Sequence, residues 1–283
     1  MPSPSAGSAS AGRANAAAAA PRIIADDGFY FGLGAFETVA VEDGVPLLLS
    51  EHLDRMTGTL KRLGIPREHA ELADAARRAL EYAELRGPLA LKITATKDNL
   101  LCSLRPNAYT AQRIESGFTC AVSTVRRNET SPLTQMKTLN YGDCIMQKRA
   151  ANAAGVDEPL FLNTHGQVAE GATTNVFAVI HNQLVTPPVD AGLLPGVMRA
   201  WIIEAARARE RTLALDELLA ADEVLLTNSL MGAMPVTAIT APDGTTHRFP
   251  AHGRATELAD AWRNHVQNAI TAWKETQDPW ARI

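Results

Sequence analysis

The stretch from residue 136 to residue 179 reads MKTLNYGDCIMQKRAANAAGVDEPLFLNTHGQVAEGATTNVFAV, and it decides the fold of the second half of the chain. A helix is predicted over roughly residues 140–154, and it stops at Gly155, because glycine readily takes the left-handed conformation that ends helices. The segments PLFLN and QVAEGATTNVFAVI are expected to follow as strands around a turn at Thr164-His165-Gly166. Helix and paired strands together indicate mixed α and β structure.

Two residues of this stretch could carry chemistry. Lys137 lies between Met136 and Leu139, so a partly apolar pocket could lower the pKa of its ammonium and favour covalent attack on a carbonyl. Glu170 ends the strand QVAE and precedes small and hydrogen-bonding residues at 171–175, which leave room for a flat ligand. Taken singly, a loop lysine is usually solvated, and a surface carboxylate at the strand end is the alternative for Glu170.

Two later segments offer hydrogen-bond donors suited to a phosphate. Pro195 and Gly196 open a helix in AGLLPGVMRAWIIEAARARE, and the free N–H groups at its N-terminus, those of Val197 and Met198, would favour an anion. Thr227-Asn228-Ser229 ends the strand EVLLTNSL. Ordinary capping is the alternative for both. A final helix is expected from about residue 254 to residue 273.

The first half of the chain is predicted to form a smaller α+β unit. FETVAVEDGVPLLL indicates a hairpin that turns at Asp43-Gly44, and Ser50 is expected to cap the helix that follows. Arg55 lies off the apolar stripe of that helix. A second helix is expected over roughly 67–86, and strands over 89–97 and 118–125 close the unit. We therefore predict a disordered tail over 1–21, an N-terminal domain over 22–125, a linker over 126–135 and a C-terminal domain over 136–283.

Composition excludes several classes of protein. The 283 residues carry 27 Lys+Arg against 31 Asp+Glu, a formal charge of −4 without a basic stripe, so nucleic acid is not an expected partner. The three cysteines and seven histidines lack the spacing of a zinc site, and we expect no metal. No apolar run approaches the ~20 residues of a membrane span. We expect a cytoplasmic protein without membrane association. FGLG lacks a third glycine for dinucleotide binding, and no G-x-S-x-G elbow is present.

The order of these segments resembles the fold-type IV family of pyridoxal-phosphate enzymes. The resemblance covers GFYFGLGAFETVAVEDGVPLLLSEHLDRM, the 136–179 stretch, LLPGVMR and ADEVLLTNSLMGAMPV. It implies a two-domain α+β homodimer, like D-amino-acid aminotransferase, that binds pyridoxal 5′-phosphate between its domains and acts on a small-molecule amino substrate.

The resemblance also implies roles for individual residues. Lys137 in MKTLNY would hold the cofactor covalently and act as the catalytic base and acid, and Glu170 in VAEGATTN would pair with the pyridine nitrogen. Arg55 in HLDRM would bind the phosphate. The backbone N–H groups of Val197 and Met198 and the hydroxyl of Ser229 would complete the phosphate contacts. Tyr141 is a further candidate for the phenolic oxygen.

Within the family, FETVAVEDGVPLLLSEHLDRM and TNSLMGAMPV are most similar to aminodeoxychorismate lyases, which implies conversion of 4-amino-4-deoxychorismate to 4-aminobenzoate and pyruvate in folate biosynthesis. The alternatives are an aminotransferase of branched-chain or D-amino acids and a dimeric binding protein that has kept the fold. Many relatives carry an Arg-Gly-rich segment for a substrate carboxylate, whereas this chain has Lys97-Asp98-Asn99, with Arg105 only later. The carboxylate contact is therefore left unassigned.

Overall fold

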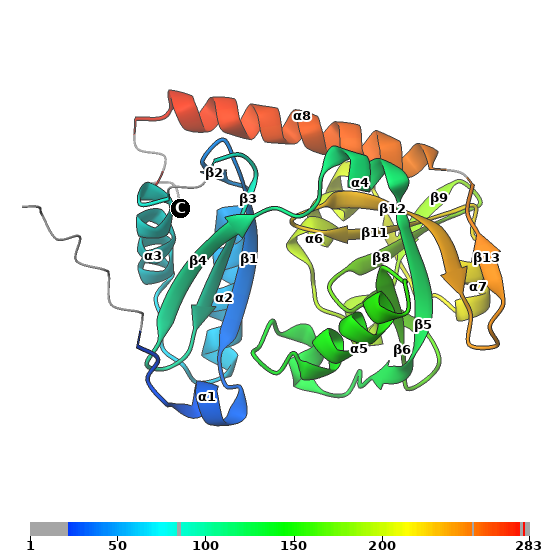
Figure 1. The fold of residues 1–283 in the computed structure, drawn as a ribbon, viewed down its shortest axis with the longest axis horizontal. Helices are drawn as coiled ribbons and strands as arrows, with labels where there is room; N and C mark the ends of the chain where they lie inside the picture. Colours follow the sequence, from blue (N-terminus) through cyan, green and yellow to red (C-terminus); the bar gives the residue numbers. More distant parts are fainter. Residues whose placement is uncertain (1–21, 84–85, 251, 278–279, 281–283) are drawn as a thin grey trace, which may run out of the picture.

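The computed structural model describes residues 22–83, 86–250, 252–277 and 280. The tail expected over 1–21 lies outside this range. The described chain forms two sheets placed side by side, with helices on their outer faces and a long C-terminal helix running across both (Figure 1). Within the described residues, no helix is long and apolar enough to cross a membrane.

The first sheet has the strand order β2-β1-β3-β4 and is antiparallel throughout. Asp43 and Gly44 both have positive φ, 50° and 80°, which confirms the hairpin turn between β1 and β2. Buried alanine and valines of β1, leucines and an isoleucine of β3, and leucines of the two helices between these strands form a core on one face. The elements are α1 (Asp27–Phe31), β1 (Ala35–Glu42), β2 (Val45–Pro46), α2 (Leu49–Arg62), α3 (His69–Glu81), β3 (Leu89–Ala95) and β4 (Leu100–Pro106).

The expected cap at Ser50 is wrong. Helix α2 begins at Leu49, its N-cap is Leu48 with φ 51°, and no side chain caps it. Leu47 and Leu49 are both buried where the chain leaves the hairpin. Burial of these leucines, rather than a capping hydroxyl, therefore fixes where this helix starts.

The second sheet curves into a closed ring. Strands β8, β11, β12, β5, β6 and β7 follow one another, and β7 pairs again with β8. A large apolar cluster packs among these strands. The remaining elements are α4 (Ala111–Ser116), β5 (Phe118–Arg127), η1 (Pro132–Gln135), α5 (Gly142–Ala153), β6 (Glu158–Asn163), β7 (Val168–Gly171), β8 (Asn175–Ile180), β9 (Gln183–Thr186), η2 (Val189–Ala191), α6 (Val197–Ala206), β10 (Arg209–Glu210), α7 (Leu215–Leu219), β11 (Glu223–Asn228), β12 (Gly232–Thr240), β13 (Thr246–Arg248) and α8 (Gly253–Glu275).

The strand expected over 118–125 does not close the first unit. It forms β5, which lies in the second sheet between β12 and β6 and runs parallel to both. The edge strand β4 completes the first sheet instead. The chain crosses between the sheets at residues 107–117, ahead of the expected linker at 126–135, which contains the end of β5 and η1. Alternation of apolar residues reports burial and not the partner strand, so the sequence pattern could not assign β5. The division into two domains remains a proposal, with its boundary at this crossing.

Helix α8 ties the two sheets together (Figure 1). Val266 and Ile270 pack against Ala40, Val45 and Leu47 of the first unit. The start of α8 is held by the second unit, since the Glu223 carboxylate on β11 accepts hydrogen bonds from the N–H groups of Arg254 and Ala255 at 3.0 and 2.7 Å. A buried carboxylate at a helix N-terminus satisfies donors that otherwise lack partners.

Replacing this carboxylate should destabilise the fold. Glu223→Ala leaves two backbone donors unpaired in a buried place, so we expect the free energy of unfolding to fall by about 2 kcal/mol. Denaturant titration measures it. Glu257→Ala, at an exposed site on the same helix, is the matched control. Equal unfolding free energies for the two variants would contradict this role of Glu223.

Candidate active site

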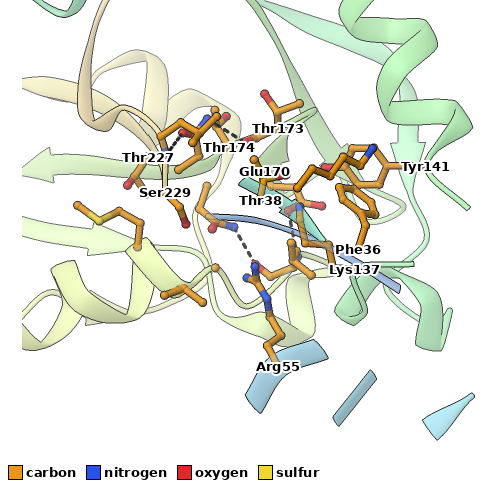
Figure 2. A pocket seen from close by; sticks show the side chains of 18 of the residues that line it. Phe36, Thr38, Arg55, Lys137, Tyr141, Glu170, Thr173, Thr174, Thr227 and Ser229 are labelled. Atoms are coloured by element: carbon orange, nitrogen blue, oxygen red, sulfur yellow. Dashed lines mark hydrogen bonds between the residues drawn. The ribbon is translucent and has the colours of Figure 1, made fainter. Parts of the chain in front are cut away.

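A cavity of about 460 Å³ lies between the two sheets. Lys137 and Glu170 lie at its centre, with Phe36 and Tyr141 on one side and Thr227 and Ser229 on the other (Figure 2). The remaining predicted residues, Arg55, Val197 and Met198, also line the cavity. The structure therefore brings together all the residues that the sequence predicted, from both halves of the chain.

The segment that carries Lys137 is attached to the first strand of the opposite sheet. The N–H of Phe36 donates to the carbonyl of Lys137 at 3.0 Å, and the N–H of Leu139 donates to the carbonyl of Gly34 at 3.0 Å. A bridge between Ala35 and Thr138 lies between these hydrogen bonds. The lysine therefore enters the cavity from a backbone position that both halves of the molecule determine.

Lys137 has the environment of a reactive amine. Its Nζ lies 4.5 Å from the centroid of the Phe36 ring and 5.3 Å from that of Tyr141. Burial, with the nearby charge of Arg55, lowers the pKa of Lys137 to about 8. A larger fraction of neutral amine is therefore available for attack on a carbonyl than at an ordinary lysine.

Glu170 lies on β7 and pairs with Asn175 of β8. This pairing closes the ring of strands. One carboxylate oxygen lies 2.8 Å from Nη2 of Arg127, and the other accepts from the N–H of Leu194 at 2.9 Å. Burial raises the pKa of Glu170 to about 7, against the opposing effect of Arg127. The carboxyl can therefore share a proton near neutral pH with a basic nitrogen beside it.

Arg55 crosses from the first unit to the second. Its guanidinium contacts the Glu37 carboxylate at 2.7 and 2.6 Å and donates to the carbonyl of Pro195 at 2.9 Å. His52 Nδ1 lies 2.6 Å from the same carboxylate. Burial alone would raise the pKa of Glu37, but Arg55 and His52 hold it well below its usual range. The buried acid fixes the arginine at the cavity wall.

The part of the cavity wall formed by the start of α6 and the end of β11 provides donors for an anion. Helix α6 begins at Val197, and helix geometry leaves the N–H groups of Val197 and Met198 without partners inside the helix. The Thr227 hydroxyl is buried without a hydrogen-bond partner among the described residues. At Gly196, any Cβ would lie 2.1 Å from the Asn175 amide oxygen, so only glycine fits there. The wall combines free donors with a positive helix end.

The loop after Glu170 is held by a second buried acid. Glu158 is completely buried and accepts from the N–H of Thr173 at 2.7 Å and from the hydroxyl of Thr174 at 3.1 Å. Lys148 pairs with the same carboxylate. At Gly171 a Cβ would lie 2.2 Å from the Thr174 hydroxyl, so the loop packs directly on this network.

Sequence reasoning missed three acids and bases that position the site. Glu37 lies inside a predicted strand and Glu158 directly before one, where a buried charge is not expected without a partner that only the fold supplies. Arg127 lies where a linker was predicted.

The Tyr141 hydroxyl donates to the carbonyl of Ala172 at 2.7 Å. Within the described range, His, Cys, Asp and Glu side chains form no group of three or more suited to a metal ion.

The cavity combines a lysine of lowered pKa, a carboxyl of raised pKa and free donors for an anion, an arrangement suited to a phosphate-bearing carbonyl cofactor. The chain belongs to the family described as amino-transferase class IV, whose profile matches residues 34–239. It is an enzyme of fold-type IV, and its cofactor is pyridoxal phosphate. The free donors at the α6 N-terminus and the unpartnered Thr227 hydroxyl fit the phosphate of this cofactor.

Its relatives include both lyases and aminotransferases. The chain is 29% identical to the aminodeoxychorismate lyase of Bacillus subtilis over 282 residues, covering 89% of this chain and 94% of that protein. It is 30% identical to the D-alanine aminotransferase of Bacillus licheniformis over 264 residues, covering 87% and 91%. The crystal structure of 4-amino-4-deoxychorismate lyase from Pseudomonas aeruginosa matches with a TM-score of 0.74 and 30% identity, covering 87% of this chain and 96% of that chain.

The lowered pKa of Lys137 can be measured directly. Only a neutral amine reacts with acetic anhydride, so trace acetylation of cofactor-free protein should reach half its maximal rate at Lys137 near pH 8. Free Nα-acetyl-lysine amide, with an ordinary pKa of about 10.4, is labelled in the same solution as the standard. Peptide mapping by mass spectrometry measures the extent of acetylation at Lys137 at each pH. A profile that coincides with the standard would show that burial does not shift this amine.

Proposed function

We propose that the protein is an aminodeoxychorismate lyase that converts 4-amino-4-deoxychorismate to 4-aminobenzoate and pyruvate. The observation that carries this proposal is the segment TNSLMGAMPV at residues 227–236, which resembles the lyases. Aminotransferases usually carry a threonine- and glycine-rich loop here. The segment borders the phosphate end of the cavity through Thr227, Asn228, Ser229 and Leu230. Two relatives named as this lyase also align over most of both chains.

Each predicted site residue takes a role under this proposal. Lys137 would hold the cofactor covalently. Glu170, with its carboxyl fixed by Arg127, would keep the pyridine nitrogen protonated. Arg55, the N–H groups of Val197 and Met198 and the Ser229 hydroxyl would hold the phosphate. Tyr141 and Phe36, which lie beside the Lys137 amine, would border the cofactor ring.

The reaction needs one mobile proton and one leaving group. When bound, pyridoxal phosphate supplies an electron sink for the carbon that bears the substrate nitrogen. The amine of Lys137, freed by the substrate, removes the proton from that carbon. The C–O bond to the enolpyruvyl group then breaks, the ring becomes aromatic, and the released enolpyruvate takes up a proton to become pyruvate.

The second candidate is an aminotransferase of D- or branched-chain amino acids. The relative named D-alanine aminotransferase, at 30% identity over most of its length, favours it.

A homodimer also remains a proposal. It is supported by the exposed aromatic side chains of Phe29, Tyr30 and Phe31 on α1, which a second copy of the chain could cover. The cytoplasmic location stays a prediction.

Turnover without a keto acid separates the two reactions. A lyase regenerates its starting state after each cycle, whereas an aminotransferase stops after one half-reaction until an amino acceptor arrives. We expect sustained formation of pyruvate and 4-aminobenzoate from 4-amino-4-deoxychorismate with no 2-oxo acid added. Lactate dehydrogenase coupling measures the pyruvate. Absence of pyruvate, with many turnovers of D-alanine or leucine plus 2-oxoglutarate, would replace the lyase by the aminotransferase.

Neutralising Glu170 should separate cofactor binding from catalysis. Glu170→Gln cannot hold the pyridine nitrogen protonated, so we expect the variant to keep its cofactor and lose activity by about 10²–10³-fold. Absorbance of the purified protein reports the cofactor, and the coupled assay reports the rate. Glu115→Gln, on the exposed face of α4, carries the same change of charge as a control. Normal turnover by Glu170→Gln would remove this residue from the mechanism.

A further inference from the structure

The face of the first sheet that borders the cavity carries two cations. Residues alternate along a strand, so Leu91 and Ile93 point into the core of the first unit while Lys92 points to the other side. On β4, Arg105 pairs with Ala90, which places it diagonally from Lys92 on the same face. Both residues line the cavity.

Apart from Lys137, which holds the cofactor under the proposed function, these two cations differ from the others in the cavity wall because their charges are not balanced. Arg55 is paired with Glu37, and Lys148 with Glu158. Among the described residues, Lys92 and Arg105 have no carboxylate at ion-pair distance. Lys92 lies over the Phe36 ring, and Arg105 donates only to the carbonyl of Pro106. The cavity therefore has two cations available for an anionic ligand.

The sheet fixes the backbone positions of both cations, while their side chains remain exposed. Lys92 lies in the middle of β3, between β1 and β4. Just after Arg105, the Asn107 side chain donates to the carbonyl of Leu230 at 2.8 Å, and its N–H donates to the carbonyl of Pro88 at 2.9 Å. The end of β4 is thus tied to the loop that begins at Ser229. The backbone of Arg105 is therefore anchored beside this part of the cavity.

The position of Lys92 relative to Lys137 indicates the shape of the ligand. The Phe36 ring contacts both ammonium groups, with centroid distances of 4.9 Å to Lys92 and 4.5 Å to Lys137. One aromatic ring therefore borders both the reacting amine and a free cation. In an α-amino acid the carboxylate is attached to the carbon that bears the amine. A carboxylate at Lys92 suits a ligand in which a six-membered ring separates the two groups.

We propose that Lys92 and Arg105 bind the two carboxylates of the substrate and select a dianionic ring over a simple α-amino acid. The inference rests on the proposed lyase function. The products carry one carboxylate each, so the substrate carries two, and in 4-aminobenzoate the amine and carboxylate stand at opposite positions of the ring. The pair supplies the carboxylate contact for which the chain lacks the Arg-Gly-rich segment of its relatives.

Chorismate is a suitable probe because it has both carboxylates and a hydroxyl in place of the reacting amine, so it binds without turning over. Titration calorimetry of the holoenzyme gives its dissociation constant. We expect Lys92→Met and Arg105→Met each to weaken chorismate about tenfold or more, because each removes a charge-assisted contact. The same variants should raise KM for 4-amino-4-deoxychorismate by a similar factor and change kcat less. Lys97→Met, on the exposed β3–β4 turn, makes the same change of net charge and should leave both constants unchanged.

The outcomes separate this inference from the proposed function. Loss of chorismate affinity in both variants, in a protein that forms no pyruvate, would retain the carboxylate site and reject the lyase. Lyase activity with unchanged KM and unchanged chorismate affinity in both variants would reject the carboxylate site and retain the lyase. A wild-type protein that does not bind chorismate, or a Lys97→Met variant as weak as the other two, would also overturn the inference.

Discussion

The backbone pairing of residues 137–139 with the start of β1 is the contact on which the site depends. The hydrogen bonds from Phe36 N–H to Lys137 and from Leu139 N–H to Gly34 hold a segment from the middle of the chain against a strand from its first part. They place a reactive amine and the aromatic ring that borders it in one fixed relation. Arg55 adds a second crossing, since it donates to Pro195 at the start of the α6 wall. Small relative movements of the two sheets would therefore disturb the amine and the anion cradle together.

Three buried or half-buried ion pairs surround the cavity, and each has a positioning role. Glu37 fixes Arg55, Glu158 holds the loop at Thr173 and Thr174, and Arg127 fixes Glu170. Buried pairs of this kind add little net stability, because desolvation offsets much of the attraction, but removing one partner leaves an uncompensated charge. Their effect here is geometric. They hold charged groups at defined places in a pocket where water would otherwise allow several arrangements.

The sequence predicted which residues gather at one cavity better than it predicted the arrangement of the strands. Lys137, Glu170 and Arg55 were identified from the resemblance of local motifs, and each stands in a segment whose turn or helix signals are strong. The placement of β5 and the capping role of Ser50 were wrong, because strand partners and helix starts depended on contacts far away in sequence. Glu37 and Glu158 could not be recognised, since only the fold brings Arg55 and Lys148 to them. Local pattern thus specified the chemistry, while long-range packing specified the geometry.

A crystal structure of the protein with pyridoxal phosphate tests the central claim most directly, namely that this cavity holds the cofactor through Lys137. The account predicts continuous electron density from Lys137 Nζ to the cofactor. It also predicts the phosphate between Arg55 and the first turn of α6, and the ring nitrogen beside Glu170. A cofactor bound through another lysine, or turned so that its phosphate lies at Glu170, would contradict it.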